Sequence, residues 1–349
     1  MKKNILLLVI LFFISTLVSC SQKEKVKSEN LEYSFYVANW NVENLFDVID
    51  DPDKNDEEFL PSGSKEWTER KLINKMTNLA RVIEFMNDGN GPDILGVEEV
   101  ENEALLIDLT ENYLENKNYK IAYSESPDAR GIDNGLIYNS EVFGIESVNP
   151  LSIQFDEPKS SRDILFVQLV AHKNKEVLNV FVNHWPSRRE GLKESEKFRI
   201  NAAETLLKEI DKLKKENPNP AIIILGDFND LPANISISKT LNAKPINCED
   251  ENRDSFLQNI TYNLFQKGEG SYKYKDNWNM LDQIIISNSL LDKVGIDYIC
   301  NSFIIIKPDF MVEQEGKYKG TPWPTFGGRK YLGGYSDHFP VGAKFIINN

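Results

Sequence analysis

Side chains capable of acid, base or metal chemistry occur in clusters where apolar runs of the sequence end. These clusters are Trp40-Asn41-Val42-Glu43, Val97-Glu98-Glu99-Val100, Asn183-His184-Trp185-Pro186, Gly226-Asp227-Phe228-Asn229, Leu281-Asp282 and Ser336-Asp337-His338. Strand ends that face one edge of a sheet can converge on a single crevice. One such cluster alone is more often a structural cap, but the whole set predicts a shared site.

The residue types in these clusters suit a hard divalent cation. Carboxylate and amide oxygens without thiolates favour Mg²⁺ over zinc, with Mn²⁺ and Ca²⁺ as alternatives. The imidazoles of His184 and His338 are suited to proton transfer or to hydrogen bonding with a phosphoryl oxygen. Asp282 would orient His338 and raise its pKa. The combination predicts metal-assisted hydrolysis of a phosphate ester.

The elements that must position these residues alternate between strands and helices. Apolar and β-branched runs predict strands at 33–40, 93–97, 121–123, 135–139, 164–172, 177–183, 221–227, 281–287, 303–307 and 341–347. Helical spacing of apolar residues predicts helices at 68–88, 102–116 and 194–216. No internal repeat or linker is visible after residue 33. One α/β domain of mixed sheets flanked by helices fits this order.

The N-terminal segment is typical of a secretory signal peptide over residues 1–19. Lys2 and Lys3 precede the apolar run 5–14, which is shorter than the roughly 20 residues that span a bilayer. The ending LVSC resembles the lipidation site of bacterial lipoproteins, which makes Cys20 the expected lipidated residue. A free thiol in a cleaved signal is the alternative. Residues 20–32 would form a lipidated, polar tether that holds the exported domain on a bacterial cell membrane, in the outer membrane, the periplasm or at the surface.

The charge and the cysteines limit the partners. The net charge is −14, and removal of two lysines with the signal lowers it to −16. Such a charge disfavours loose, sequence-independent binding of nucleic acid, although a bound cation can reverse the field at one site. Cys248 and Cys300 lack the spacing of a metal site, and both a disulfide and two separate thiols remain open.

The order of the motifs resembles that of the endonuclease/exonuclease/phosphatase superfamily. The matching segments are WNVEN, GVEEV, VNHWPS, GDFND, LDQIIIS and SDHFPV, within residues 33–347. This superfamily includes pancreatic deoxyribonuclease, abasic-site endonucleases, sphingomyelinases and inositol polyphosphate phosphatases. The resemblance implies a four-layer α/β sandwich over 33–349, in which two mixed β-sheets pack face to face and are flanked by helices.

The resemblance also implies roles for residues at the expected metal site. Glu99 would be the principal metal ligand, and Asn41 and Asp337 would complete or support that site. Asp227 would take a proton from the attacking water. Asn229 would hold the phosphate or the water in line.

Two histidines would act on the phosphate. His338, backed by Asp282, would stabilise the pentacovalent transition state. His184 would donate a proton to the leaving oxygen or contact the phosphate, and the sequence leaves open which histidine is the acid. Asp133 is expected near the substrate as the partner of His184.

Further charged residues bear on the substrate. Arg162 resembles the phosphate-binding arginine of the deoxyribonuclease branch, and Arg130 and Arg188 are further candidates for substrate contacts. Glu43 and Glu101 stand where that branch carries arginines that grip duplex DNA, which weakens the case for such binding. Glu43 also resembles an acidic residue beside the metal of abasic-site endonucleases, so a second cation site is conceivable.

The segment 308–335 leads directly into the last motif and is rich in aromatic residues. These are Trp323, Phe326, Tyr331 and Tyr335, among others. Loops at the rim of an active site commonly carry specificity, so these rings would stack on bases or on a sugar, or else pack the loop onto the core. His172 has no motif around it and is expected to be structural.

The sequence therefore predicts a metal-dependent phosphoesterase, most simply a nuclease that hydrolyses phosphodiester bonds of DNA or RNA. The alternative is a phosphatase or phosphodiesterase that acts on a small-molecule or lipid-headgroup ester, similar to inositol phosphatases or sphingomyelinases. A binding protein that has lost the chemistry is disfavoured, because every expected catalytic position is filled. We expect a monomer with no protein partner, in contact with the membrane only through its lipid.

Overall fold

The computed structural model describes residues 33–114, 117–250 and 253–348. The described residues belong to one compact unit. The predicted signal peptide, Cys20 and the tether lie outside the described residues. Within the described part of the chain, no helix is long and apolar enough to cross a bilayer.

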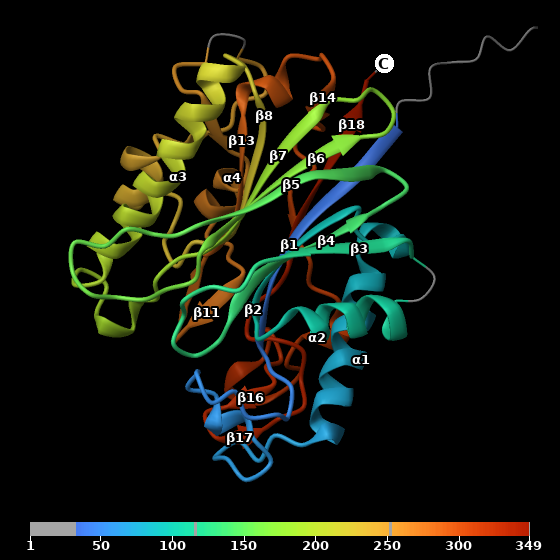
Figure 1. Cartoon of the computed structure of the whole chain (residues 1–349), viewed down its shortest axis with the longest axis vertical. Helices are drawn as coiled ribbons and strands as arrows, with labels where there is room; N and C mark the ends of the chain where they lie inside the picture. The colour runs from blue at the N-terminus through green and yellow to red at the C-terminus, as the bar shows by residue number, and fades with distance from the viewer. Residues whose placement is uncertain (1–32, 115–116, 251–252, 349) are drawn as a thin grey trace, which may run out of the picture. The chain divides into compact units, whose positions relative to one another are not determined.

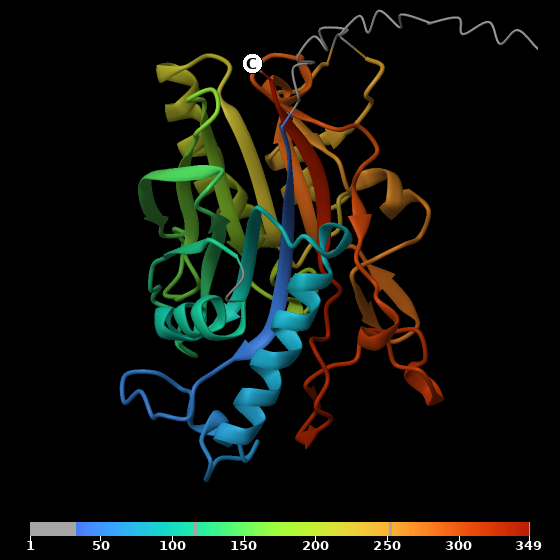
Figure 2. The same ribbon diagram turned by 90° about the vertical axis from the view of Figure 1, so that its right-hand side faces the viewer.

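Two seven-stranded mixed sheets form the centre of this unit (Figure 1). The first has the order β14 (Ile296–Tyr298), β18 (Val341–Ile347), β1 (Tyr33–Leu45), β2 (Ile94–Val100), β4 (Asp133–Asn139) and β3 (Tyr119–Tyr123), with β15 (Ile304–Ile305) also paired to β18. The second has the order β5 (Phe143–Leu151), β6 (Ile164–Ala171), β7 (Val177–His184), β8 (Ala221–Asp227), β13 (Asp282–Ser287), β10 (Leu257–Asn259) and β9 (Lys244–Pro245). Strands from distant parts of the sequence are neighbours, as β1 and β18 show (Figure 2).

Three apolar layers hold the sheets and helices together. One lies between the two sheets, one between the first sheet and the helices α1 (Glu69–Phe85) and α2 (Glu103–Asp108), and one between the second sheet and α3 (Glu196–Glu216). Figure 1 shows α3 on one side of the strands and α1 and α2 on the other. The predicted four-layer α/β sandwich is therefore confirmed.

The central strands are buried on both faces, which explains their continuous apolar sequences. In β1, Val37 faces the other sheet, while Ala38 and Trp40 face the helices. The sheets approach closely at Gly96 of β2, where an added Cβ would lie 2.2 Å from Cδ1 of Leu225 in β8. A side chain at this position would push the two sheets apart just below their polar ends.

Several predicted bounds differ from the structure. The helix predicted at 68–88 ends at Phe85, because Asn87 and Asp88 have positive φ angles of 52° and 57°. The helix predicted at 102–116 is α2 followed by a wider turn over Leu109–Tyr113. Strand β5 was not predicted, since it lies at the sheet edge and most of its residues are at least partly exposed.

The two cysteines of the described domain form a disulfide. Cys248 and Cys300 are bonded across a separation of 52 residues. The alternative of two separate thiols, which the sequence left open, is therefore not what the structure shows. The bond joins the chain after β9 to the turn after β14, and thus links segments that belong to different sheets.

Candidate active site

A cleft of about 840 Å³ lies where the polar ends of strands from both sheets meet. Among the predicted residues, it is lined by Asn41, Glu99, Arg130, Arg162, His184, Arg188, Asp227, Asn229, Asp337 and His338. Strand register explains part of this gathering, because Asp227 lies opposite His184 on one side and opposite Asp282 on the other. The parallel pair β7 and β8 thus ends at the same edge as the start of β13.

Asp227 connects residues from the two sheets. Its carboxylate accepts hydrogen bonds from the side chain of Asn41 at 3.1 Å and from the backbone of Asn229 at 2.8 Å. Nε2 of His184 lies 3.7 Å from Asp227 Oδ2 and 3.8 Å from Glu99 Oε1. Burial raises the pKa of Asp227 to about 6, with a further rise from Asp282 that the nearby His338 opposes. The group is therefore a carboxylate poised to accept a proton near neutral pH.

His338 is held as a cation by a buried carboxylate. Its Nδ1 lies 2.7 Å from Oδ2 of Asp282, which also accepts a hydrogen bond from the hydroxyl of Ser271. Burial lowers the pKa of His338, but the charge and hydrogen bond of Asp282 outweigh it and raise the pKa well above its ordinary value. The main chain is also fixed, because Nε1 of Trp40 donates to the His338 carbonyl at 3.0 Å.

The pKa of His184 is shifted in the opposite direction. Burial lowers the pKa of His184 well below its ordinary value, and the charge of Arg162 lowers it further, so the imidazole is neutral. Its Nδ1 has no hydrogen-bond partner among the described residues. The expected pairing with Asp133 is wrong, since the carboxylate of Asp133 accepts from the hydroxyl of Tyr123 and the backbone of Ser126.

The Asp282 carboxylate sets a pH dependence that can be tested. Because the pKa of His338 is raised, its protonated form persists to higher pH than that of an ordinary histidine and is lost as the pH rises through the folded-state pKa. We expect Asp282→Asn to move the alkaline decline of kcat/KM to lower pH. A pH profile of both enzymes measures this, together with NMR titration of the imidazole. Superimposable alkaline limbs would contradict the role of Asp282.

The donors in the cleft fit the divalent cation that the sequence predicts. Glu99 and Asp337 both line the cleft, and burial together with the charge of Glu99 raises the pKa of Asp337, so a cation between them would relieve their repulsion. Asn41 turns its amide NH₂ toward Glu99 and Asp227 and thus supports the carboxylates. No group of three or more His, Cys, Asp or Glu side chains in the described residues is already arranged to hold a metal. An all-oxygen set of this kind suits a hard ion that retains waters.

Glu43, the candidate for a second cation site, is bonded to a loop of the protein and is not among the residues that line the cleft. Both of its carboxylate oxygens accept backbone hydrogen bonds, from Thr325 at 2.6 Å and from Phe326 at 3.0 Å. Nearby, the buried ammonium of Lys75 donates to the Thr325 hydroxyl and to the Tyr335 carbonyl, each at 2.6 Å. These bonds hold the loop that leads into Asp337. Lys75 was missed, although a lysine within the apolar stripe of α1 is an unusual signal.

The predicted arginines differ in what their guanidinium groups contact. Arg162 is buried and donates to Asp128 at 3.2 Å and to the Trp185 carbonyl at 2.7 Å, while its Nε has no partner among the described residues. Arg188 is engaged by the protein itself, with hydrogen bonds to the Asn229 carbonyl at 2.6 Å and to three further side chains. Arg188 therefore shapes the turn that carries Asn229. Arg130 lies 3.7 Å from Asp128 at the cleft wall.

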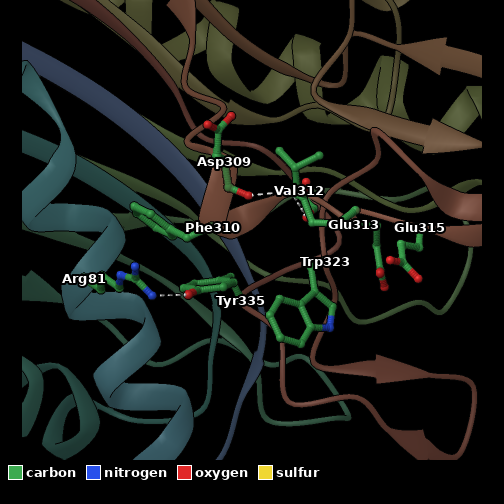
Figure 3. A pocket seen from close by; sticks show the side chains of 9 residues that line it. Arg81, Asp309, Phe310, Val312, Glu313, Glu315, Trp323 and Tyr335 are labelled. Carbon is green, nitrogen blue, oxygen red and sulfur yellow. Dashed lines mark hydrogen bonds between the residues drawn. The ribbon is translucent and has the colours of Figure 1, made fainter.

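The aromatic residues of 308–335 lie away from this cleft. Trp323 and Tyr335 line a separate hollow of about 730 Å³ with Arg81 and Phe310 (Figure 3). There the rings contact each other, and Arg81 donates to the Tyr335 hydroxyl at 3.0 Å. Phe326 packs against Trp67 and Tyr331. These rings therefore pack the loop. The tyrosines that line the cleft at the strand ends are Tyr272 and Tyr274, which the sequence did not suggest.

Several site residues have left-handed backbone conformations. The φ angles are 54° at Glu43, 52° at Asn44, 65° at Glu99 and 49° at Asn229. Residues with a Cβ seldom adopt this conformation, and the local cost is of order 1–3 kcal/mol at each position. Such strain concentrates at functional sites. Here it aims the Glu99 and Asn229 side chains into the cleft.

Comparisons with known proteins agree with this geometry. The sequence matches the Endonuclease/Exonuclease/phosphatase family over residues 36–346. No curated protein matches the chain by sequence. Similar solved structures include an endonuclease/exonuclease/phosphatase family protein from Bacteroides thetaiotaomicron, with 15% identity, a TM-score of 0.57 and coverage of 91% of this chain and 99% of that chain.

Two further solved structures are similar to this chain. A mannosyl-6-phosphatase of Bacteroides thetaiotaomicron VPI-5482 has 14% identity, a TM-score of 0.57 and coverage of 90% of this chain and 100% of that chain. The human Nocturnin catalytic domain has 15% identity, a TM-score of 0.53 and coverage of 90% and 95%. At these identities the likeness concerns the fold.

Proposed function

Because the chain belongs to the endonuclease/exonuclease/phosphatase family, and is thus a phosphoesterase of that superfamily, we propose that it is a nuclease. It hydrolyses phosphodiester bonds of DNA or RNA with the help of a divalent cation, Mg²⁺ first among the candidates. The observation that carries this proposal is the single cleft shared by Glu99, Asp227 and His338, which come from distant parts of the chain.

The side chains of the cleft divide the work of hydrolysis between them. Glu99 and Asp337 would hold the cation, which when bound supplies positive charge that polarises the phosphate. Asp227 takes the proton of the water that attacks phosphorus, and the adjacent Asn229 orients that water. As the bond to the leaving oxygen breaks, His338 is the group with a proton to donate, since Asp282 keeps it charged.

The basic residues of the cleft favour a polyanionic substrate over a small ester. Arg130, Lys159, Arg162 and Arg189 line the same cleft as the catalytic residues. Arg189 is exposed, and Lys159 forms its ion pair with Glu190 at 2.7 Å at the rim. Cationic groups that continue beyond the scissile phosphate can follow a nucleic-acid backbone. Basic side chains are as numerous as acidic ones in the lining of the cleft, and this local balance supports the proposal despite the acidic charge of the whole chain.

A panel of substrates tests the function. The purified mature protein is incubated with single-stranded DNA, duplex DNA, RNA, a hexose 6-phosphate and phosphocholine, each with Mg²⁺, Mn²⁺, Ca²⁺ or chelator. We expect nucleic-acid cleavage that chelator abolishes. Release of phosphate from the small esters, with intact nucleic acid, would instead support the alternative phosphatase. Activity that persists in chelator would contradict the metal requirement.

We also propose export and lipid attachment at Cys20, with the domain acting as a monomer at a bacterial membrane. The Cys248–Cys300 disulfide supports export, because such bonds persist mainly outside the reducing cytoplasm. We expect the protein in membrane fractions, with Cys20→Ser shifting it to the soluble fraction and removing incorporation of labelled fatty acid. Unchanged membrane association of the variant would contradict the lipid anchor. A Cys248→Ser variant that retains its label is the control.

A further inference from the structure

The hairpin of β11 (Tyr272–Tyr274) and β12 (Asn277–Asn279) has two different faces. On one face, Lys273 lies opposite Trp278, and the Trp278 ring stacks near Phe339 with centroids 6.0 Å apart. On the other face, Tyr272, Tyr274 and Asn279 line the catalytic cleft. The face that carries Trp278 thus packs on the core, and the opposite face presents two tyrosines to the cleft.

The position of the hairpin is fixed relative to His338. The rings of Tyr272 and His338 stack with centroids 4.7 Å apart and an interplanar angle of 30°. The same two residues form an antiparallel bridge, and the backbone of Phe339 donates to the Ser271 carbonyl at 2.8 Å. Ser271 in turn bonds to Asp282. Tyr272 therefore links the hairpin to the imidazole that faces the phosphate.

Tyr274 extends this aromatic surface away from His338. It is 58% exposed although it lines the cleft, and two residues along a strand place it about 6.6 Å beyond Tyr272. The Nζ of Lys275 lies 5.2 Å from the centre of its ring, so a basic group accompanies the aromatic one. Exposed rings beside cations, next to a cleft that holds several arginines, are characteristic of surfaces on which unpaired bases stack.

We propose that Tyr274 stacks an unpaired nucleobase adjacent to the scissile phosphate, so that the substrate is a single-stranded nucleic acid. This inference rests on the proposed nuclease function and extends it. A base within a duplex already stacks on its neighbours and cannot lay its face on Tyr274 without being displaced. Tyr272 supports the site by holding Tyr274 in register with His338. Tyr274 is a specificity residue, and it takes no part in proton transfer.

Two substrates with one phosphodiester bond each separate stacking from chemistry. One is thymidylyl-thymidine, and the other is the same dinucleotide without its bases. We expect Tyr274→Ala to raise KM for the first by about tenfold, with kcat little changed, because base stacking on an aromatic ring is worth roughly this factor or more. KM for the base-free substrate should not change. Tyr274→Trp should retain low KM, and Tyr318→Ala, at a 62% exposed tyrosine outside the cleft, is the matched control.

The outcomes distinguish this inference from the function on which it rests. Cleavage of both substrates with equal KM values for Tyr274→Ala and wild type would overturn base stacking and leave the nuclease intact. Failure of wild type to cleave either substrate or any longer nucleic acid would overturn both. A second measurement is the affinity of the protein for a fluorescent oligothymidylate in the presence of chelator, which prevents cleavage. There, Tyr274→Ala should weaken binding of the single strand and leave binding of a duplex of equal length unchanged, and equal weakening of both would reject the preference for unpaired bases.

Discussion

Replacement of His338 by alanine is expected to lower kcat on the order of 10²-fold or more, with a small change in KM. The variant loses the protonated imidazole that Asp282 maintains in the cleft, and with it the proton that would pass to the leaving oxygen. A steady-state assay with single-stranded DNA and Mg²⁺ measures the loss. His172→Ala is the matched control, because that histidine is exposed, lies outside the cleft and has its Nε2 3.2 Å from the carbonyl of Ser140.

The loss at His338 must be separated from damage to the fold. The imidazole packs on Tyr272, so we include His338→Gln, which retains bulk and a hydrogen-bonding group but holds no titratable proton near neutral pH. Both variants should be less stable, because Asp282 loses its buried partner, but each should still unfold in a single cooperative transition in denaturant. Near-wild-type turnover in a folded His338→Gln enzyme would remove this residue from the mechanism.

Replacement of Asp227 is the second large effect, and we again expect kcat to fall on the order of 10²-fold or more. Asp227→Ala removes the proton acceptor and also the three hydrogen bonds that hold Asn41 and Asn229. Asp227→Asn keeps one acceptor oxygen and replaces the other with an amide NH₂, so it removes the basicity and the hydrogen bonds at one oxygen only. A similar loss in both variants, together with the pH dependence described next, assigns the effect to proton transfer.

The pKa of Asp227 adds a signature to this experiment. Since burial raises that pKa to about 6, the carboxylate is protonated as the pH falls below about 6 and the wild-type rate should decline there. In Asp227→Asn the residual activity should lack this acidic decline. Asp211→Ala, at an exposed position of α3, is the control. Full activity of Asp227→Asn at neutral pH would exclude Asp227 as the base.

The sequence predicted best where a local pattern determines a position in the fold. Apolar runs such as 221–227 are buried on both faces of the sheet, and their polar ends then meet at one edge because parallel neighbours end together. Asp227 and His184 could be placed in this way from strand ends alone. The layering of the sheets was predicted only from the resemblance to a known superfamily, because the periodicity within a strand does not specify which sheet that strand joins.

Pairing between side chains was harder to predict. Asp133 and His184 both stand at strand ends, yet Asp133 bonds to Tyr123 and Ser126. Glu43 is bonded to a loop that lies more than 280 residues later in the sequence, a distance at which no spacing rule operates. The cleft tyrosines belong to a short hairpin between longer elements, and its placement depends on the contact of Trp278 with Phe339.

The left-handed residues at Glu43, Asn44, Glu99 and Asn229 have a consequence for laboratory evolution. Glycine adopts this conformation without a steric penalty. Selection of random variants for heat resistance alone would therefore favour glycine at Glu99 or Asn229, which line the cleft, rather than at Glu43, which anchors a loop, and the survivors would be robust but catalytically inert. Stability and turnover thus place opposite requirements on the same residues, so a screen for a thermotolerant enzyme must measure both.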